Sequence, residues 1–145
     1  MCVCASDLWY YRGQPDYPQG NPIGHEFVRV VEHVGDGVQN IAKGDFIIAS
    51  FFYSDSTCPN CRAGNTSACI AGGGWGVNGI DGGQGEALRV PLADGTLVKV
   101  QGSDHSDKTL ASLFTIFDVM STGHHVAKVQ ASRKVIQSPS SVMEL

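Results

Sequence analysis

The chain has 145 residues, of which 42% are hydrophobic and 17% are charged, and its formal net charge is −4. This length gives room for one domain with one hydrophobic core, and the acidic balance gives no support to a nucleic-acid partner. No apolar run is long enough to span a membrane, and no basic region followed by an apolar stretch opens the chain. We therefore expect a cytoplasmic protein that makes no contact with a membrane.

The cysteines fall into two groups along the chain, at positions 2 and 4 and at positions 58, 61 and 69. In a reducing compartment such groups are typical of metal ligands or free thiols and not of disulfides. The 18 glycines indicate many turns, as a barrel of short strands needs.

A thiol, a hydroxyl and a carboxylate lie close together near the N-terminus, at Cys4, Ser6 and Asp7. A thiolate can bind zinc, a hydroxyl can pass on a proton, and a carboxylate can hold a metal ligand from behind. The alternative is a small buried cysteine followed by a short helix that Asp7 caps. From this segment alone both interpretations stay open.

His25 and Glu26 follow a loop rich in proline and glycine, at the point where strand character begins. A histidine beside a glutamate at such a junction can be a metal ligand with an acidic neighbour. A buried structural histidine is the ordinary alternative, and the pair on its own does not decide between them.

Four segments have strand character: Glu26–Val34, Phe46–Phe52, Glu86–Pro91 and Leu97–Val100. The glycine-rich residues 71–85 have no predicted strand before them and no predicted helix after them. This context supports neither a dinucleotide fingerprint nor a phosphate-binding loop, so we expect an irregular surface loop.

Cys58 and Cys61 form a CxxC pair, and Cys69 follows eight residues later. Asp55 repeats the three-residue spacing on the other side of Cys58, so its carboxylate can complete a set of four zinc ligands. The alternatives are a redox-active CxxC pair, which normally opens a helix in a βαβ unit, and three incidental thiols. The spacing favours a structural zinc site.

A helix is predicted over Asp107–Phe117, with Ser106 as its N-cap, and a second helix can begin near Val119. Asp118 would be carried beside the buried face, where an unpaired carboxylate is costly, so a cation or a hydrogen-bond partner is expected. Adjacent histidines in a helix point about 100° apart, so His124 and His125 are not expected to share a metal. Residues 131–145 form a predicted C-terminal tail.

These motifs, in this order, resemble the zinc-containing medium-chain alcohol dehydrogenases. The similarity runs from Cys2 to about Lys128 and combines two separate zinc patterns. It implies a mainly β fold, a GroES-like β-barrel with short C-terminal helices, over residues 1–130.

By this resemblance Cys4, His25 and Asp118 hold a catalytic zinc ion, and Glu26 lies beside it as a transient ligand. Ser6 starts a proton relay and Asp7 orients His25. The resemblance further implies that Trp9 and Tyr10 line the alcohol pocket. It also implies a structural zinc site whose ligands are Asp55, Cys58, Cys61 and Cys69. The reaction that the resemblance implies is oxidation of a small alcohol with hydride transfer to NAD(P).

The sequence departs from the family in three ways. Asp55 stands where most relatives have a fourth cysteine, and Trp9 stands where some have a relay histidine. Relatives also have strands before the Cys4 motif and a Rossmann domain after Gly123, so we expect a truncated catalytic lobe that is inactive alone. The alternative is a non-enzymatic zinc-binding barrel used as a binding or assembly module. Unpaired barrel edges predict a homo-oligomer.

Overall fold

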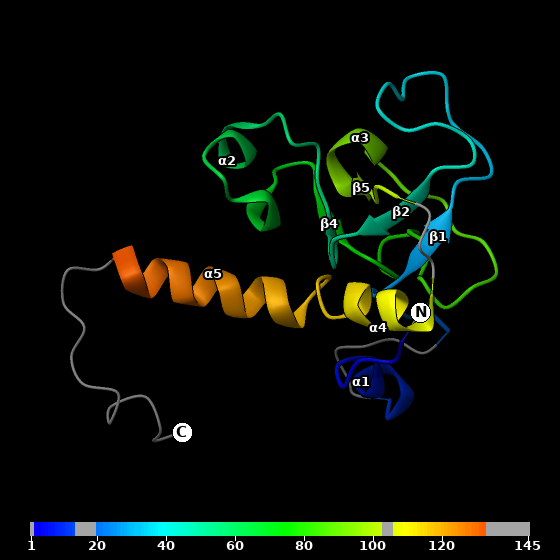
Figure 1. The fold of residues 1–145 in the computed structure, drawn as a ribbon. Helices are drawn as coiled ribbons and strands as arrows, with labels where there is room; N and C mark the ends of the chain where they lie inside the picture. Colours follow the sequence, from blue (N-terminus) through cyan, green and yellow to red (C-terminus); the bar gives the residue numbers. More distant parts are fainter. Residues whose placement is uncertain (1, 14–19, 103–105, 133–145) are drawn as a thin grey trace.

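The computed structural model describes residues 2–13, 20–102 and 106–132. Its elements are arranged around two small sheets, with a long helix at one side (Figure 1). In chain order they are α1 (Asp7–Tyr11), β1 (Val28–Val30), β2 (Phe46–Ala49), β3 (Phe52–Tyr53), α2 (Pro59–Arg62), the 3-10 helix η1 (Thr66–Ala68), β4 (Gly73–Gly74), α3 (Ala93–Thr96), β5 (Leu97–Lys99), α4 (Asp107–Phe114) and α5 (Val119–Ser132).

Both sheets are antiparallel, one with the strand order β1-β2-β5 and the other with β3 beside β4. In the larger sheet Ile48 lies opposite Val28 on one side and Val98 on the other. The antiparallel sheets agree with the predicted fold class. However, the strands of the described residues form two open sheets and no closed barrel.

The core forms around Phe27, Ala49 and Trp75, all of which are buried. The rings of Phe27 and Trp75 meet edge to face with centroids 5.1 Å apart, and the indole Nε1 of Trp75 donates to the carbonyl of Ser50 at 2.9 Å. Because Phe27 directly follows His25 and Glu26, this packing fixes the position of the chain where the candidate ligands lie.

Three of the predicted strands are shorter than expected, and the one over Leu97–Val100 loses only its last residue, as β5. The strand predicted over Glu26–Val34 is paired only as β1, because the opposite chain turns at Gly44, whose N–H bonds to the carbonyl of Val31. The strand predicted over Phe46–Phe52 divides into β2 and β3, which belong to different sheets.

The strand predicted over Glu86–Pro91 is wrong, since this segment belongs to neither sheet of the described residues. Its alternating side chains suggested a strand, but the backbone N–H of Arg89 bonds to the Asp81 carboxylate at 2.7 Å and not to another strand. A local side-chain acceptor has replaced the sheet partner.

The glycine-rich residues 71–85 are not a surface loop throughout, and that prediction is wrong for part of the segment. Gly76, Gly82 and Gly83 are buried. Gly82 lies so close to the backbone of Ile23 that an added Cβ atom would be 2.4 Å from its carbonyl oxygen. Only glycine allows this approach, so the segment packs against the residues that lead to His25.

We expect Gly82→Ala to destabilise the protein by about 1–3 kcal/mol, because backbone atoms of Ile23 must move to admit the new methyl group. Gly35→Ala is the matched control, since a Cβ atom there meets nothing within 4 Å. Urea unfolding of both variants measures the difference. Equal stability would contradict the close approach.

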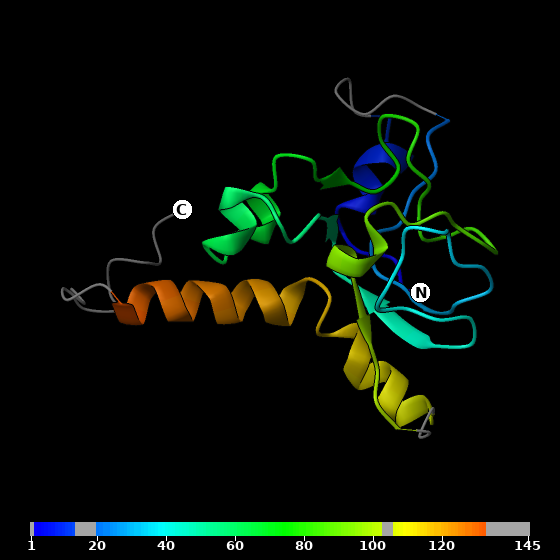
Figure 2. The same ribbon diagram turned by 90° about the horizontal axis from the view of Figure 1, so that it is seen from above.

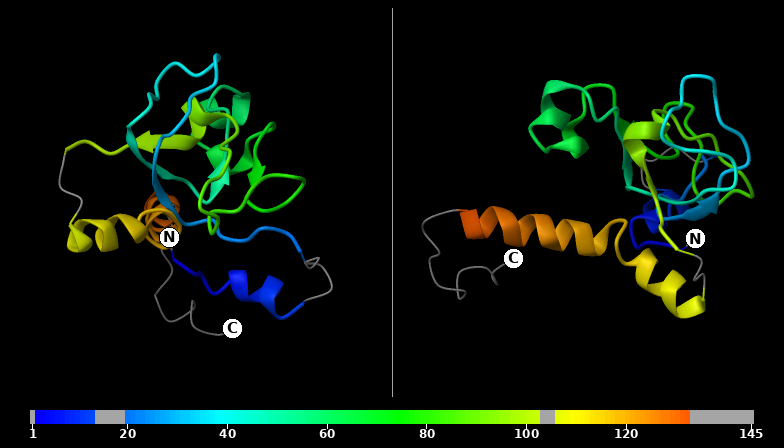
Figure 3. Two further views of the ribbon diagram at one scale, coloured as in Figure 1. Left: turned by 90° about the vertical axis from the view of Figure 1, so that its right-hand side faces the viewer. Right: turned by 45° about the horizontal axis from the view of Figure 1, so that its top comes forward.

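The two C-terminal helices meet at a turn. Ser106 caps α4 as predicted, because its hydroxyl accepts a hydrogen bond from the N–H of Thr109. The helix ends at Phe114 and not at Phe117, and Asp118 lies in the turn that precedes α5. Figures 2 and 3 show α5 extending away from the sheets. The side chains of Met120 and Val126 on this helix are exposed. The predicted tail lies outside the described residues from position 133 onward.

Candidate metal centres

The first candidate centre combines donors from three separate parts of the chain. Ligand atoms of Cys4, His25, Glu26 and Asp118 all lie within 4.8 Å of one another. Cys4 precedes α1, His25 and Glu26 lie between the proline-rich loop and β1, and Asp118 lies between α4 and α5. The thiol, imidazole and carboxylate groups suit zinc, so the donor set fits the predicted metal.

His25 lies between two carboxylates. Its Nδ1 atom is 3.3 Å from Oδ1 of Asp7, and its Nε2 atom is 3.5 Å from Oδ2 of Asp118. The Asp7 side chain is buried and also accepts a hydrogen bond from the N–H of Cys4 at 2.9 Å. Asp7 therefore does not act as an N-cap of α1. It contacts two residues of the centre from behind, as a carboxylate that orients a histidine ligand does.

Glu26 is buried and is in contact with Cys2, which was not among the predicted site residues. The thiol of Cys2 donates a hydrogen bond to Oε2 of Glu26 over 2.5 Å. Burial, and then the Glu26 contact, raise the pKa of Cys2 to about 12, so Cys2 remains a thiol and a donor. The available signal was the spacing of Cys2 and Cys4, which places both on one side of an extended segment.

The second candidate centre is formed by Asp55, Cys58, Cys61 and Cys69, whose ligand atoms also lie within 4.8 Å of one another. Oδ1 of Asp55 accepts hydrogen bonds from the N–H groups of Cys58 and Thr57, which hold the pKa of this carboxyl well below its usual range. The N–H of Cys61 lowers the pKa of Cys58, whereas burial raises that of Cys61 to about 12.

The lobe that carries this second centre has almost no hydrophobic core. From Pro59 to Ala71, Cys61 is the one buried residue. A metal held by three soft thiolates and a carboxylate would provide the stabilisation that apolar packing does not. The redox alternative does not fit, because the helix α2 that Cys58 caps lies between antiparallel strands and not in a βαβ unit.

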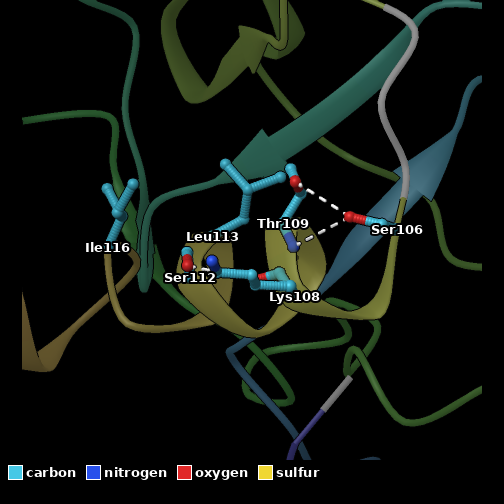
Figure 4. Close-up of a pocket in the computed structure, with 6 residues that line it drawn as sticks. All are labelled: Ser106, Lys108, Thr109, Ser112, Leu113 and Ile116. Atoms are coloured by element: carbon cyan, nitrogen blue, oxygen red, sulfur yellow. Dashed lines mark hydrogen bonds between the residues drawn. The ribbon is translucent and has the colours of Figure 1, made fainter.

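Other features lie apart from these two centres. A pocket of about 360 Å³ opens beside α4 (Figure 4). Its lining includes no residue of either centre and consists of Ser106, Lys108, Thr109, Ser112, Leu113 and Ile116. In the described part of the chain, no helix is long and apolar enough to cross a membrane.

Comparison with known proteins places the chain in a family. Residues 1–102 match the alcohol dehydrogenase GroES-like domain. The chain belongs to the GroES-like alcohol dehydrogenase family. It is 34% identical over 139 residues to a medium chain reductase/dehydrogenase, ucsI, of Acremonium sp., a match that covers 95% of this chain and 46% of that protein.

Other relatives show the same partial overlap. The chain is 35% identical to zinc-type alcohol dehydrogenase B of Aspergillus flavus, covering 86% of this chain and 28% of that protein. Alcohol dehydrogenase TADH from Thermus sp. ATN1 superposes with a TM-score of 0.77 at 32% identity, covering 90% of this chain and 38% of the other. This member of the alcohol dehydrogenase family therefore spans less than half the length of these relatives. The zinc-type relatives imply zinc, and NAD(P) in full-length members of the family, as predicted from the sequence.

Asp55 distinguishes the second centre of this alcohol dehydrogenase homologue from an all-cysteine site. We expect Asp55→Cys to bind zinc more tightly than the wild type and Asp55→Asn to bind it less tightly, because zinc favours thiolate and an amide carries no charge. Competition with a chromophoric chelator gives the order of affinities. The same affinity in all three proteins would show that Asp55 does not act as a ligand.

Proposed function

We propose that this chain is the catalytic lobe of a zinc-dependent alcohol dehydrogenase that oxidises a small alcohol to an aldehyde or ketone. The observation that carries the proposal is the first centre, where Cys4, His25 and Asp118 approach one another while the buried Asp7 holds His25 from behind. A catalytic zinc site needs three protein ligands and one open position, and Glu26 is turned toward Cys2.

Cys4, His25 and Asp118 would hold the ion. When zinc is bound, it supplies the Lewis acidity that lowers the pKa of an alcohol hydroxyl. Ser6 lies between Cys4 and Asp7 in the sequence, is partly exposed and makes no capping hydrogen bond to α1. Its hydroxyl would start the proton relay by taking the alcohol proton while it passes its own proton on toward water. Glu26 retains its role as the neighbouring carboxylate that can become a transient ligand.

The remaining parts of the proposal follow from the same resemblance. Trp9 and Tyr10, both on α1, would form the wall of the alcohol pocket. The centre at Asp55, Cys58, Cys61 and Cys69 would hold a structural zinc ion that keeps its lobe folded.

Hydride transfer requires NAD(P), which the protein must seat against the alcohol. No helix follows the glycine-rich residues 71–85 directly in the described chain, so this segment is no pyrophosphate site of the usual type. We propose that the nucleotide is seated by another part of the full-length enzyme. The 145-residue chain alone should then give no alcohol-dependent NAD(P)H absorbance, and a measurable signal would contradict this.

Cobalt substitution distinguishes the enzyme lobe from a zinc-binding assembly module. We expect propan-2-ol to change the visible absorption of the cobalt-loaded wild type, because the first centre has an open position. The change should be absent in His25→Gln, whose second centre still binds cobalt. An unchanged wild-type spectrum would favour the assembly module.

Two further predictions concern the oligomeric state of the protein and its location in the cell. The outer strands of the larger sheet, β1 and β5, each pair on one side only in the described residues, which supports the predicted homo-oligomer. A strictly monomeric mass by light scattering would contradict it. The cytoplasmic location stays a prediction.

A further inference from the structure

We infer that Gln84, in the glycine-rich segment, is a positioning residue of the first centre that acts on His25 through Asp7. The inference rests on the proposed function for its catalytic meaning, whereas the contacts themselves do not depend on a metal.

The contact that carries the inference is between Gln84 and Asp7. Nε2 of Gln84 donates to Oδ2 of Asp7 at 3.4 Å, the same oxygen that accepts from the N–H of Cys4. The other oxygen, Oδ1, faces Nδ1 of His25 at 3.3 Å. The two donors on Oδ2 thus fix the rotation of the carboxylate and leave Oδ1 for the imidazole.

Asp7 depends on these donors because its side chain is only 4% exposed. A buried carboxylate without hydrogen bonds is costly, and one that loses a donor rotates toward whatever donors remain. Removal of the Gln84 amide therefore changes how Asp7 faces His25, although the hydrogen bond of the Gln84 side chain goes to Asp7 and not to His25.

The backbone of Gln84 is held firmly, which makes its side chain a defined support. Its N–H donates to the carbonyl of Ile23 at 3.1 Å, and the neighbouring Gly83 N–H donates to the carbonyl of Gly24 at 2.7 Å. Arg29 holds the two residues that flank Gln84, because its Nη2 atom donates to the carbonyls of Gly83 and Gly85 at 2.9 and 2.6 Å.

Gly24 explains how Gln84 comes so close to the centre. A Cβ atom on Gly24 would be 2.6 Å from Cγ of Gln84 and 2.9 Å from its backbone nitrogen, and Gly24 has a positive φ of 99°. A side chain at position 24 would push the loop away from Asp7. The absence of a side chain at position 24 therefore allows Gln84 to reach Asp7.

The test compares Gln84→Met, which keeps the length of the side chain but has no donor, with the exposed control Gln101→Met. Zinc affinity is measured on the full chain by chelator competition, and the ¹⁵N shifts of the His25 ring are recorded without metal at one fixed pH. We expect Gln84→Met to weaken the first centre by about tenfold, the lower end of the effect of outer residues on metal sites. We also expect the His25 Nδ1 shift to move, with no change for the control.

If Gln84→Met fails to fold, Gln84→Asn takes its place in the test, because its shorter side chain retains an amide that no longer reaches Asp7. We expect the same loss of zinc affinity and the same change in the His25 shift. Wild-type affinity together with unchanged His25 shifts in a folded variant would overturn the inference. A wild-type chain that binds only one zinc would instead contradict the proposed function, and the His25 shifts would still report on Gln84.

Discussion

A Cys61→Ser variant is expected to lose one bound zinc ion per chain and to unfold the lobe formed by residues 55–72. The physical reason is the composition of the lobe, in which Cys61 is the one buried residue from Pro59 to Ala71. Where apolar burial is this small, the free energy of metal binding is the free energy of folding. Serine can neither replace the thiolate nor fill the buried position with an apolar group.

Elemental analysis and hydrogen exchange measure the two effects separately. We expect about two zinc ions per wild-type chain and one in the variant, with faster amide exchange confined to residues 55–72. Ser67→Ala is the matched control, because Ser67 is exposed in the same lobe and is not a ligand. Full zinc content and unchanged exchange in Cys61→Ser would refute the structural role of the second centre.

A Phe27→Ala variant is expected to lose about 3–5 kcal/mol in free energy of unfolding, a large part of the total for a small domain. Phe27 is 0% exposed and packs edge to face on Trp75, so its removal leaves a cavity at the centre of the core. Because Glu26 precedes it directly, the loss should also loosen the first metal centre.

Phe52→Ala provides the comparison for the core variant. Phe52 has a similar edge-to-face contact, with its ring centroid 5.2 Å from that of Phe51, but it is 37% exposed. Its truncation therefore removes less buried apolar surface. Urea unfolding should show a clearly smaller loss of stability for Phe52→Ala. Equal losses would contradict the placement of Phe27 at the centre of the core.

The donor sets of both centres could be proposed from the sequence, for two different reasons. Cys58 and Cys61 lie one turn apart, so local geometry alone brings their sulfur atoms together. Cys4, His25 and Asp118 share no local spacing, and only the resemblance to a family indicated that they meet. The structure brings each set within 4.8 Å, which supports both ligand assignments as proposals.

The strand predicted over Glu86–Pro91 and the partners of the first centre show what the sequence could not provide. Alternation identifies a segment that can form a strand, but pairing depends on which chain lies beside it, and here Asp81 bonds to Arg89. The contacts of Cys2 with Glu26 and of Gln84 with Asp7 arise only where distant segments pack together. The spacing of Cys2 and Cys4 marks Cys2 but not its partner, and no pattern along the chain marks Gln84.

The first centre joins the start of the chain to the junction between its last two described helices. A metal ion held by Cys4, His25 and Asp118 would thus be a reversible cross-link that closes two large loops of the polypeptide. By thermodynamic linkage, each tenfold rise in free zinc above the dissociation constant would add about 1.4 kcal/mol to the apparent stability. The protein would then be only as stable as the zinc buffering of its surroundings allows.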